Sequence, residues 1–426
     1  MKKFEKIIGY TAEKEELIRI ADILKNNEVY TALGAAAPRG LLLYGVPGVG
    51  KTLMAGCLIE ASGRPAFTCR KTESDGKFLN TIKKTFQKAA ANAPSIVFLD
   101  DVDKFANDDM YHLDSEEFVT VQSCMDELKD KEVFVLATAN DTRCLPKSLL
   151  RAGRFDRKMN IRPPKGEDAE RIISHYFKGK QIAGDINARS IAAILEGRSS
   201  AELESIVNEA ALIVGYRREQ HITMEQMTEV CMCVIYQISE IKKGVDISGK
   251  TEISQAVWHE AGHVAVAETL CLGSVSLVNI GEKEGSPHGI TKSSLESLGR
   301  SFTAIEADIL ISLAGRAAVE IFPGTLDLGS CADQHSAFRS VGDLIENKCI
   351  NGFQFYCEFE SISIEAERER AEAALMERYY ERAKEIILSH RGFWEATARA
   401  LAEKGLLFAE DVAEIRRQCD GVPAIA

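Results

Sequence analysis

Three short, continuously apolar runs at residues 41–44, 96–99 and 133–136 alternate with longer stretches in which apolar residues recur at helical spacing. Continuous runs of this length are typical of parallel strands buried on both faces, because neither face of such a strand meets water. The helical stretches between them cover roughly residues 50–61 and 79–92. The pattern therefore predicts an α/β sheet of parallel strands, which ends before Pro163-Pro164.

The pattern changes after this point, and residues from 167 to about 240 are mostly helical in period. Ser199, followed by Glu202 three residues later, predicts a capping box at the start of a helix over 203–217. Farther on we expect a helix from about Ser254 to Cys271, a strand region at 275–280 and 288–291, and helices to near Arg417.

A chain of 426 residues is too long for one core of ordinary size, so the patterns are divided into domains. The polar segment 242–250 contains two glycines and few apolar side chains, which is typical of a linker. We predict an α/β subdomain at 1–163, a helical lid at 164–241, a linker at 242–253 and a mainly α-helical domain at 254–426.

A glycine-rich turn joins the first predicted strand to the first helix. It fits the pattern G-x4-G-K-[ST] with Gly45, Val46, Pro47, Gly48, Val49, Gly50, Lys51 and Thr52. Backbone N–H groups of such a turn surround phosphate oxygens at the positive end of the helix. Lys51 is expected to reach the β- and γ-phosphates of ATP, and the Thr52 hydroxyl to ligate Mg²⁺.

The acid pair Asp100-Asp101 follows the second apolar run, about fifty residues after the glycine-rich turn. Strand-end aspartates also cap turns, but this spacing favours a magnesium site. Asp100 would hold Mg²⁺, directly or through water, and Asp101 would polarise the attacking water.

The helix predicted over 254–271 contains His259-Glu260-Ala261-Gly262-His263, an H-E-x-x-H motif. Four-residue spacing sets both imidazoles on one face, one turn apart, as a single Zn²⁺ requires. Glu260 lies beside them, where it can take a proton from the zinc-activated water and pass it to the leaving amine. Two structural histidines with a solvated glutamate are the alternative interpretation.

A catalytic zinc site needs a third protein ligand, and spacing alone does not choose it. The extended motif H-E-x-x-H-x-x-G-x-x-H fails, because Val266 and Thr269 occupy its last two positions. The candidates that remain are acids and histidines that follow the motif: Glu268, Glu282, His288, Glu306, Glu320, Asp327, Asp333 and His335.

Charge, apolar runs and cysteine content limit the binding partners and the cellular compartment that we expect for this chain. A net charge of -12 without a basic stripe argues against a nucleic-acid partner. No apolar run is long enough to cross a bilayer and the N-terminus lacks a signal-peptide core, so no membrane insertion by this chain is expected. Eleven scattered cysteines indicate free thiols in a reducing cytoplasm.

The chain resembles the AAA+ ATPases at several further segments. Their polar sensor at a strand end matches Asn140, and their adenine-packing segment matches Ile8-Gly9. Their arginine-finger segment matches residues 150–157, so the resemblance implies that Arg154 and Arg157 reach the nucleotide of a neighbouring subunit. Structural ion pairs are the other interpretation of these arginines. Fingers that act between subunits imply a homo-oligomeric ring, in this family usually a hexamer.

Within that class, nearly the whole chain is similar to the FtsH-type ATP-dependent zinc metalloproteases, through residues 207–212, 258–263 and 313–318. In that family an Asp in a G-x-x-x-D segment is the third zinc ligand, which implies Asp333 here, with His335 in reserve. Helix capping is the other interpretation of Asp333. The family also binds substrate as an added β-strand, which would fall near residues 288–291.

The chain departs from the family at three places. Asp101 stands where Glu is usual, which retracts the carboxylate by about 1.5 Å and weakens the positioning of water. The pore-loop segment at 72–80 is shorter and more polar than usual, and its sole aromatic residue, Phe78, is as well explained by burial at a helix start. The chain also begins at the ATPase, so a membrane anchor would require an upstream segment that was removed.

The sequence thus predicts an AAA+ module, with a parallel sheet and a helical lid, followed by a mainly α-helical zinc metallopeptidase domain. The expected function is an ATP-dependent zinc metalloendopeptidase that unfolds and degrades proteins. Two alternatives stay open: a zinc peptidase with a weakened motor that acts on loose chains, and a non-proteolytic AAA+ remodelling ATPase. The retention of His259, Glu260 and His263 together argues against the last.

Overall fold

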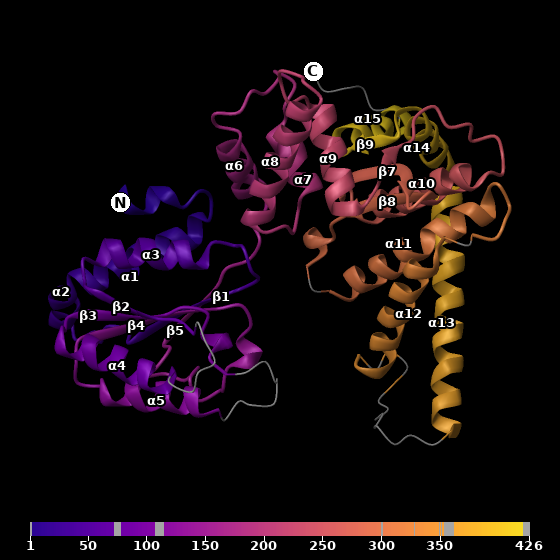
Figure 1. The fold of residues 1–426 in the computed structure, drawn as a ribbon. Coiled ribbons are helices and arrows are strands. Elements are labelled where there is room, and N and C mark those ends of the chain that lie inside the picture. The colour runs from indigo at the N-terminus through magenta and orange to yellow at the C-terminus, as the bar shows by residue number, and fades with distance from the viewer. Residues whose placement is uncertain are drawn as a thin grey trace. The chain divides into compact units, whose positions relative to one another are not determined.

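A computed structural model describes residues 2–71, 78–106, 115–299, 301–327, 329–348, 350, 352 and 362–420 (Figure 1). The chain forms two compact units, Met1–Met227 and Thr228–Ala426, and helix α9 (Met224–Tyr236) runs across the division. The four domain boundaries drawn from the sequence are finer than these two units and stay predictions.

The first unit contains a five-stranded sheet in the order β2-β3-β4-β1-β5, in which all pairs are parallel. Its strands are β1 (Gly40–Tyr44), β2 (Ala66–Cys69), β3 (Ser95–Leu99), β4 (Val133–Ala139) and β5 (Arg157–Asn160). The helices around the sheet are η1 (Lys2–Lys6), α1 (Thr11–Lys25), α2 (Asn27–Ala32), α3 (Lys51–Ser62), α4 (Phe78–Ala91), η2 (Val102–Lys104), α5 (Glu116–Glu127) and η3 (Thr142–Cys144). The predicted parallel sheet is confirmed.

Helices cover both faces of this sheet. Figure 1 shows α1 and α3 on one face and α4 and α5 on the other. The strands β3 and β4 are buried along their whole length, which is why each reads as a continuous apolar run. The two strands that the sequence did not predict, β2 and β5, are the outer strands, and most of their residues are partly or fully exposed. Edge strands carry no continuous apolar signal, so they escaped detection.

A helical subdomain completes the first unit, with α6 (Gly166–Tyr176), α7 (Ala188–Ile194) and α8 (Ser200–Tyr216). The predicted capping box is confirmed, because Ser199 and Glu202 exchange side-chain and backbone hydrogen bonds at the start of α8. This end of α8 meets the phosphate loop, where Ala201 N donates to Gly48 O at 3.0 Å.

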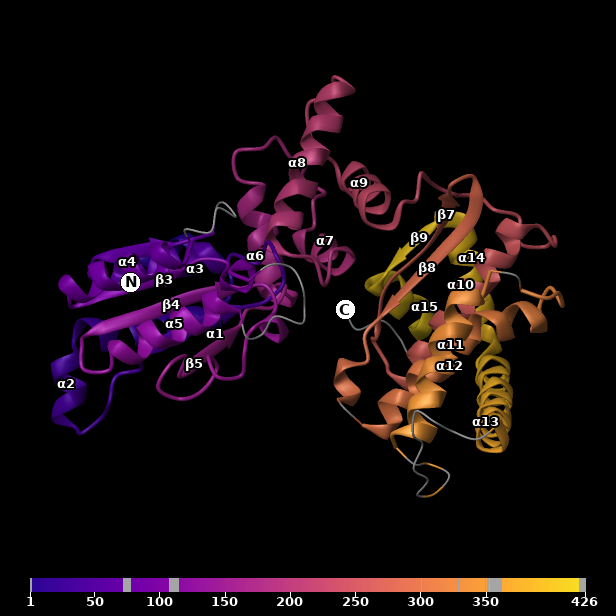
Figure 2. The same ribbon diagram turned by 60° about the horizontal axis from the view of Figure 1, so that its bottom comes forward.

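The second unit combines a small antiparallel sheet with long helices (Figure 2). Its strands are β6 (Glu240–Ile241), β7 (Val275–Lys283), β8 (Ser286–Ser293) and β9 (Leu406–Phe408). Both β6 and β9 pair with β7, at different positions along it, and β8 pairs with the other edge of β7. In the described part of the chain, no strand pairs with the outer edge of β8.

The helices of this unit are α10 (Glu252–Leu270), η4 (Glu296–Leu298), α11 (Phe302–Ile321), α12 (Cys331–Glu346), α13 (Ile362–Ser389), α14 (Arg391–Lys404) and α15 (Ala409–Asp420). α10 is the central helix and is buried almost all round from Val257 to Glu268, against α11, α14, β7 and β8. Such burial explains why α10 carries an apolar majority rather than one apolar stripe. The H-E-x-x-H motif lies within this buried part.

The predicted linker segment is fastened to the second unit. Gly244 N donates to Glu403 O, Val245 N donates to Ala402 O, and Trp258 Nε1 donates to Ile247 O. The segment therefore packs along its length rather than crossing open solvent. None of the described helices has the length and hydropathy needed to cross a membrane.

Candidate metal and nucleotide sites

The two motif histidines lie in the buried middle of α10. This helix begins at Thr251, whose hydroxyl caps the chain by accepting from Ser254 N. The motif follows two turns later, so His259 and His263 lie one turn apart on the same face. The exposed fractions of the two histidines and of Glu260 are all below one tenth, so the surroundings fix their orientation.

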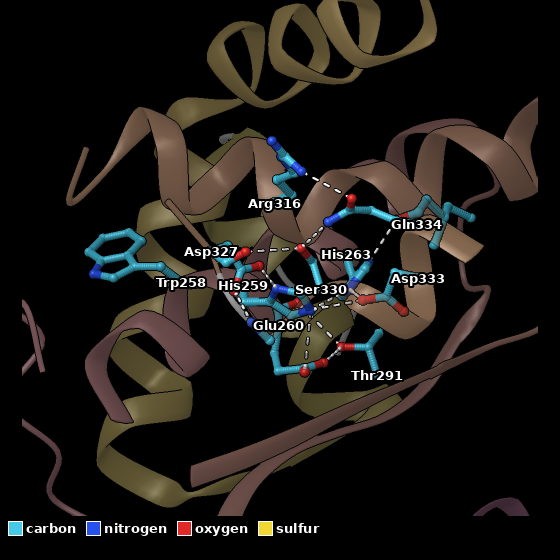
Figure 3. Close-up of polar contacts among 12 residues, drawn as sticks. Trp258, His259, Glu260, His263, Thr291, Arg316, Asp327, Ser330, Asp333 and Gln334 are labelled. Carbon is cyan, nitrogen blue, oxygen red and sulfur yellow. Dashed lines mark hydrogen bonds and ion pairs between the residues drawn. The ribbon is translucent and has the colours of Figure 1, made fainter. Parts of the chain in front are cut away.

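Three ligand atoms converge at this face (Figure 3). The Nε2 atoms of His259 and His263 lie 2.9 Å apart, and Asp333 Oδ2 lies 3.2 Å from the first and 3.5 Å from the second. Tetrahedral zinc with bonds of about 2.0–2.1 Å spaces its ligands by about 3.3 Å. The three residues therefore fit a zinc ion.

The other ring nitrogens are both engaged, so the Nε2 atom of each ring is the one that faces Asp333. His263 Nδ1 lies 2.7 Å from Ile311 O, and His259 Nδ1 lies 2.6 Å from Asp327 Oδ2. Gly315 leaves room for the imidazole of His259, because a Cβ at position 315 would fall within 2.5 Å of three atoms of that ring. Neighbouring hydrogen bonds and a close glycine thus fix both the tautomer and the position.

Carboxylates dominate the electrostatics around His259. Burial opposes protonation of this imidazole, but hydrogen bonds to Asp327 and Asp333 and the nearby Glu260 raise its pKa to about 10. Burial likewise opposes ionisation of Asp333, yet hydrogen bonds with His259 and His263 lower its pKa. A site with this negative character favours a cation.

Glu260 points toward β8. Thr291 Oγ1 donates to Glu260 Oε2 at 2.6 Å, and Glu260 Oε1 lies 4.0 Å from His259 Nε2 (Figure 3). Gly289 makes this approach possible, since a Cβ there would lie 2.3 Å from Glu260 Cγ. The carboxylate is thus held beside the ligand cluster by the strand whose outer edge has no partner in the described chain.

The remaining third-ligand candidates lie elsewhere. Glu268 accepts from the backbone N–H groups of Gly273 and Val275, and His335 is exposed with its Nδ1 3.9 Å from Cys331 Sγ. The others also have different partners or are exposed: Glu282 pairs with Lys242, Glu306 with Tyr379, Glu320 with Lys384, and His288 is exposed. Asp327 contacts the cluster, but on the far nitrogen of His259.

The glycine-rich turn curls between β1 and α3. Lys51 Nζ donates to Gly45 O at 2.7 Å, to Val46 O at 3.0 Å and to Asn140 Oδ1 at 2.9 Å. Burial lowers the pKa of Lys51, partly offset by the acids at 101, 103 and 100. The structure thus brings the lysine and the strand-end asparagine together across two neighbouring strands.

The acid pair lies beside this turn at the end of β3. Asp100 Oδ1 accepts from Thr138 Oγ1 at 2.8 Å and from Thr52 Oγ1 at 3.2 Å. Asp101 has a left-handed backbone, with φ of 54°, and its carboxylate lies 2.9 Å from Lys104 Nζ. Arg70 also approaches both acids, at 3.7 Å and 3.6 Å. Two cations therefore engage Asp101.

A cavity of about 790 Å³ connects these residues with the helices α6 and α8. Its walls include the phosphate loop, the N-terminal segment and helices α6 and α8, through Ile8, Gly48, Gly50, Lys51, Thr52, Asp101, Lys104, Asn140, His175, Tyr176 and Ala201. Gly9 follows the lining residue Ile8 and packs closely against Asp168 of α6. Its φ of 67° is a left-handed backbone conformation that glycine adopts without strain. The cavity is large enough for a nucleotide.

The arginine-finger candidates have different surroundings. Arg154 is bound within its own unit, donating to Asp126 at 2.9 Å, to Gln122 at 3.0 Å and to Ser148 O at 2.6 Å. Arg157 is exposed on the outer strand β5. Of these two, Arg157 has the side chain that a neighbouring molecule can reach directly.

The pore-loop candidate Phe78 is a core residue. It is 8% exposed at the start of α4 and packs edge-on against Phe105, with ring centroids 4.8 Å apart. The structure thus favours the burial interpretation over a pore-loop aromatic. The rest of the proposed loop, residues 72–77, lies outside the described residues.

Several residues around the sites were not singled out from the sequence for the positions that they hold: Gly289, Thr291, Gly315, Lys104 and Arg70. Gly315 belongs to the segment 313–318 that carried the family resemblance, and Thr291 to the expected strand at 288–291, so both were near a usable signal. Nothing in the sequence pointed to Lys104 and Arg70, because charged side chains near strand ends are common.

Taken together, the fold and the two clusters define a chain that joins an AAA-type nucleotide-binding module to an H-E-x-x-H metallopeptidase domain. Residues 41–163 match the ATPase family associated with various cellular activities (AAA). Over 97% of its length the chain is 30% identical to ATP-dependent zinc metalloprotease FtsH 2 of Symbiobacterium thermophilum, covering 74% of that protein. The chain belongs to the FtsH family of ATP-dependent zinc metalloproteases.

Other relatives give the same family. The chain is 30% identical to the FtsH of Streptobacillus moniliformis over 78% of its own length and half of the relative's, and 29% identical to the chloroplastic FTSH of Capsicum annuum over 94% and 66%. It therefore spans between 50% and 74% of these three relatives.

Proposed function

We propose that the chain is an ATP-driven zinc endopeptidase, in which ATP turnover in the first unit unfolds polypeptides that the second unit cleaves. The observation that carries this proposal is the convergence of His259, His263 and Asp333 within 3.5 Å, with Glu260 beside them. Zinc, ATP and Mg²⁺ are its cofactors.

At the peptidase site, His259, His263 and Asp333 would hold the metal through Nε2, Nε2 and Oδ2. A bound zinc ion would supply Lewis acidity to the scissile carbonyl and to water. Glu260 would act as general base toward the attacking water and then return the proton to the leaving amine. The hydroxyl of Thr291, 2.6 Å from Glu260 Oε2, supports this role by orienting the carboxylate.

Polypeptide substrate would bind along the outer edge of β8, extended and paired through its backbone. Two observations support this location: β8 bears Thr291, which contacts Glu260, and it pairs with β7 through its other edge. Backbone pairing is largely independent of side-chain identity, which suits an enzyme that degrades many proteins.

In the ATPase site, the phosphate loop and Lys51 would bind the phosphates, while Thr52 and Asp100 would hold Mg²⁺. Ile8 and Gly9 would pack the adenine, and Asn140 would sense the γ-phosphate. Asp101 would orient the attacking water. Its contact with Lys104 and its short side chain support slow hydrolysis.

The ATPase units would assemble into a homo-oligomeric ring, a hexamer in this proposal. The exposed Arg157 supports a contact with a neighbour's nucleotide, whereas Arg154 would first have to leave Asp126 and Gln122. Polypeptides are the proposed substrates, and the charge of -12 argues against nucleic acid. A cytoplasmic location is part of the proposal, since the described cysteines are free thiols.

One alternative has specific support: a working peptidase with a weak motor. Asp101 is engaged by Lys104 and Arg70, and Phe78 is buried in the core rather than available to grip polypeptide. Such an enzyme would cleave peptides and loose chains but would leave folded proteins intact.

Casein degradation in the presence of ATP tests the proposal. We expect Glu260→Gln to abolish cleavage and to leave ATP hydrolysis unchanged. Lys51→Ala should lose ATP hydrolysis and degradation of a folded substrate, while an unstructured peptide is still cleaved. A wild-type protein that cleaves the peptide, but never a folded substrate with ATP, would support the weak-motor alternative. Cleavage unaffected by Glu260→Gln would refute the proposal.

A further inference from the structure

A buried carboxylate lies on the far side of His259, away from the converging ligand atoms. Asp327 Oδ2 is 2.6 Å from His259 Nδ1, and only 7% of the Asp327 side chain is exposed. Asp327 lies between α11 and α12, outside the H-E-x-x-H motif and outside the G-x-x-x-D segment. The inference drawn from it rests on the proposed zinc peptidase function.

Asp327 is not a ligand of the same metal. Nδ1 and Nε2 lie on opposite sides of the imidazole, and His259 directs Nε2 toward His263 and Asp333. A carboxylate bound at Nδ1 is therefore separated from the metal position by the whole ring. It would act on a bound metal only through the imidazole.

The orientation of this carboxylate is itself fixed. Its second oxygen, Oδ1, accepts from Gly329 N at 2.9 Å. The backbone is tied as well, because Ser330 Oγ donates to Asp327 O at 3.3 Å and receives a hydrogen bond from Gln334 Nε2 at 2.7 Å. Arg316 Nη1 in turn donates to Gln334 Oε1 at 3.0 Å (Figure 3). A chain of hydrogen bonds thus runs from α11 through the start of α12 to the backbone carbonyl of Asp327.

The Nδ1 atoms of the two histidines have different kinds of partner. His263 Nδ1 meets the backbone carbonyl of Ile311, whereas His259 Nδ1 meets the carboxylate of Asp327. A carboxylate partner fixes the tautomer, orients the ring and raises the basicity of the ligating nitrogen more than a carbonyl does. Asp333 lies six residues after Asp327, in the first turn of α12, so His259 lies between Asp327 at Nδ1 and Asp333 at Nε2.

We propose that Asp327 is a positioning residue of the zinc site, which holds the His259 imidazole with Nε2 toward the metal and strengthens it as a ligand. Asp327 touches neither substrate nor metal. Its loss would act first on zinc affinity and on the geometry of the bound metal, and on peptide cleavage as a consequence.

Zinc affinity of the chain of 426 residues, measured by competition with a chromophoric chelator, tests this proposal. We expect Asp327→Ala to weaken zinc binding about 10–100-fold, the usual effect of losing an outer partner of a ligating histidine. Asp327→Asn keeps one acceptor oxygen and should lose only about fivefold, because a neutral hydrogen bond is roughly half as strong as a charge-assisted one. The matched control is Asp343→Ala, an aspartate of α12 paired with Lys348 away from the site.

Two further measurements separate positioning from general damage. Cobalt substituted for zinc reports ligand geometry, so its visible absorption bands should shift in Asp327→Ala and stay unchanged in Asp343→Ala. ATP hydrolysis and circular dichroism should match the wild type in all three variants, which would show that the chain is folded.

The outcomes distinguish this proposal from the function on which it rests. A wild-type protein that binds no zinc would overturn the peptidase function itself. A wild type that binds zinc, with a folded Asp327→Ala variant of equal affinity and unchanged cobalt spectrum, would overturn only the role of Asp327. Equal losses in Asp327→Ala and Asp343→Ala would overturn it too.

Discussion

The nucleotide cavity and the zinc cluster hold their charged groups in opposite ways. Around the cavity, Lys51 and Asp101 bond to protein groups that a ligand can replace: loop carbonyls and Asn140 for the lysine, Lys104 for the acid. In the zinc cluster the outward-facing nitrogens are fixed by Asp327 and Ile311, and the Nε2 atoms converge on one point.

This difference follows the ligand that each site serves. A nucleotide enters, reacts and leaves in every cycle, so groups with exchangeable partners suit it. A metal that stays bound gains most from ligands that need no rearrangement, because the entropy of ordering them is lost during folding rather than during binding. The contrast predicts that the zinc site tolerates little change, whereas the nucleotide site can be tuned.

Removal of the metal gives the largest expected effect and tests whether the two sites are separate. Chelation should abolish cleavage of peptides and of casein, because no other group in the cluster can replace the Lewis acid. ATP hydrolysis, followed by phosphate release in the same samples, should persist, and added zinc should restore cleavage. Cleavage that survives complete removal of zinc would show that the cluster is not the catalytic metal site on which this comparison rests.

Gly315→Ala tests the rigidity of the zinc cluster. The new Cβ would fall within 2.5 Å of three atoms of the His259 ring, which is itself fixed by Asp327 and cannot turn away. We expect zinc affinity to fall about 10–100-fold, as for other disturbances of a ligand's support.

Gly342→Ala is the control for that variant. The nearest atom to its new Cβ is Glu372 Oε1 at 3.7 Å, which is an ordinary contact. Gly342 is a partly buried helical position away from the cluster, so the variant should bind zinc like the wild type. If both alanine variants kept full affinity, the ring of His259 would have to be more mobile than its contacts indicate.

Thr291→Val removes the hydroxyl that donates to Glu260 while keeping a similar side-chain volume. A hydrogen bond to a charged group contributes about 1.5 kcal/mol, so the rate of peptide cleavage should fall roughly tenfold through loss of carboxylate orientation. Zinc affinity should not change, because Thr291 contacts no ligand of the cluster. Steady-state cleavage of a fluorogenic peptide, with zinc content measured on the same preparation, distinguishes these effects.

Asp101→Glu gives the smallest expected effect and tests the adaptability of the nucleotide site. The longer side chain should bring the carboxylate about 1.5 Å closer to the attacking water, and we expect ATP hydrolysis to rise a few-fold. Asp141→Glu, at the partly exposed aspartate bonded to Arg143, serves as the control. An unchanged or lower rate would mean that the geometry around Lys104, rather than the length of the acid, limits turnover.

The parts of the molecule that the sequence predicted are those with a local signal. The glycine-rich turn and the H-E-x-x-H motif each fit within eight residues, and the strands at 96–99 and 133–136 are apolar along their whole length. The strands β5, β6 and β9 are short or polar and lie at edges of their sheets, so burial leaves little pattern in them.

The parts that escaped are those assembled by long-range contacts. Spacing left eight candidates for the third metal ligand, among them Asp327 and Asp333, which are only six residues apart. Their opposite positions at the two nitrogens of His259 depend on how the segment between α11 and α12 folds over α10. The contacts of Gly289 and Thr291 with Glu260 likewise cross from a strand to a helix, and no sequence period encodes that pairing.

The close approach of the phosphate loop to α8 has a mechanical consequence. A Cβ at Gly48 would meet Ser199 Oγ at 2.8 Å and Ala201 Cβ at 3.0 Å, and Ala201 N is bonded to Gly48 O. With no slack between them, the loop cannot shift without pushing or pulling the first turn of α8. A movement of the phosphate loop would therefore be passed directly to the start of α8.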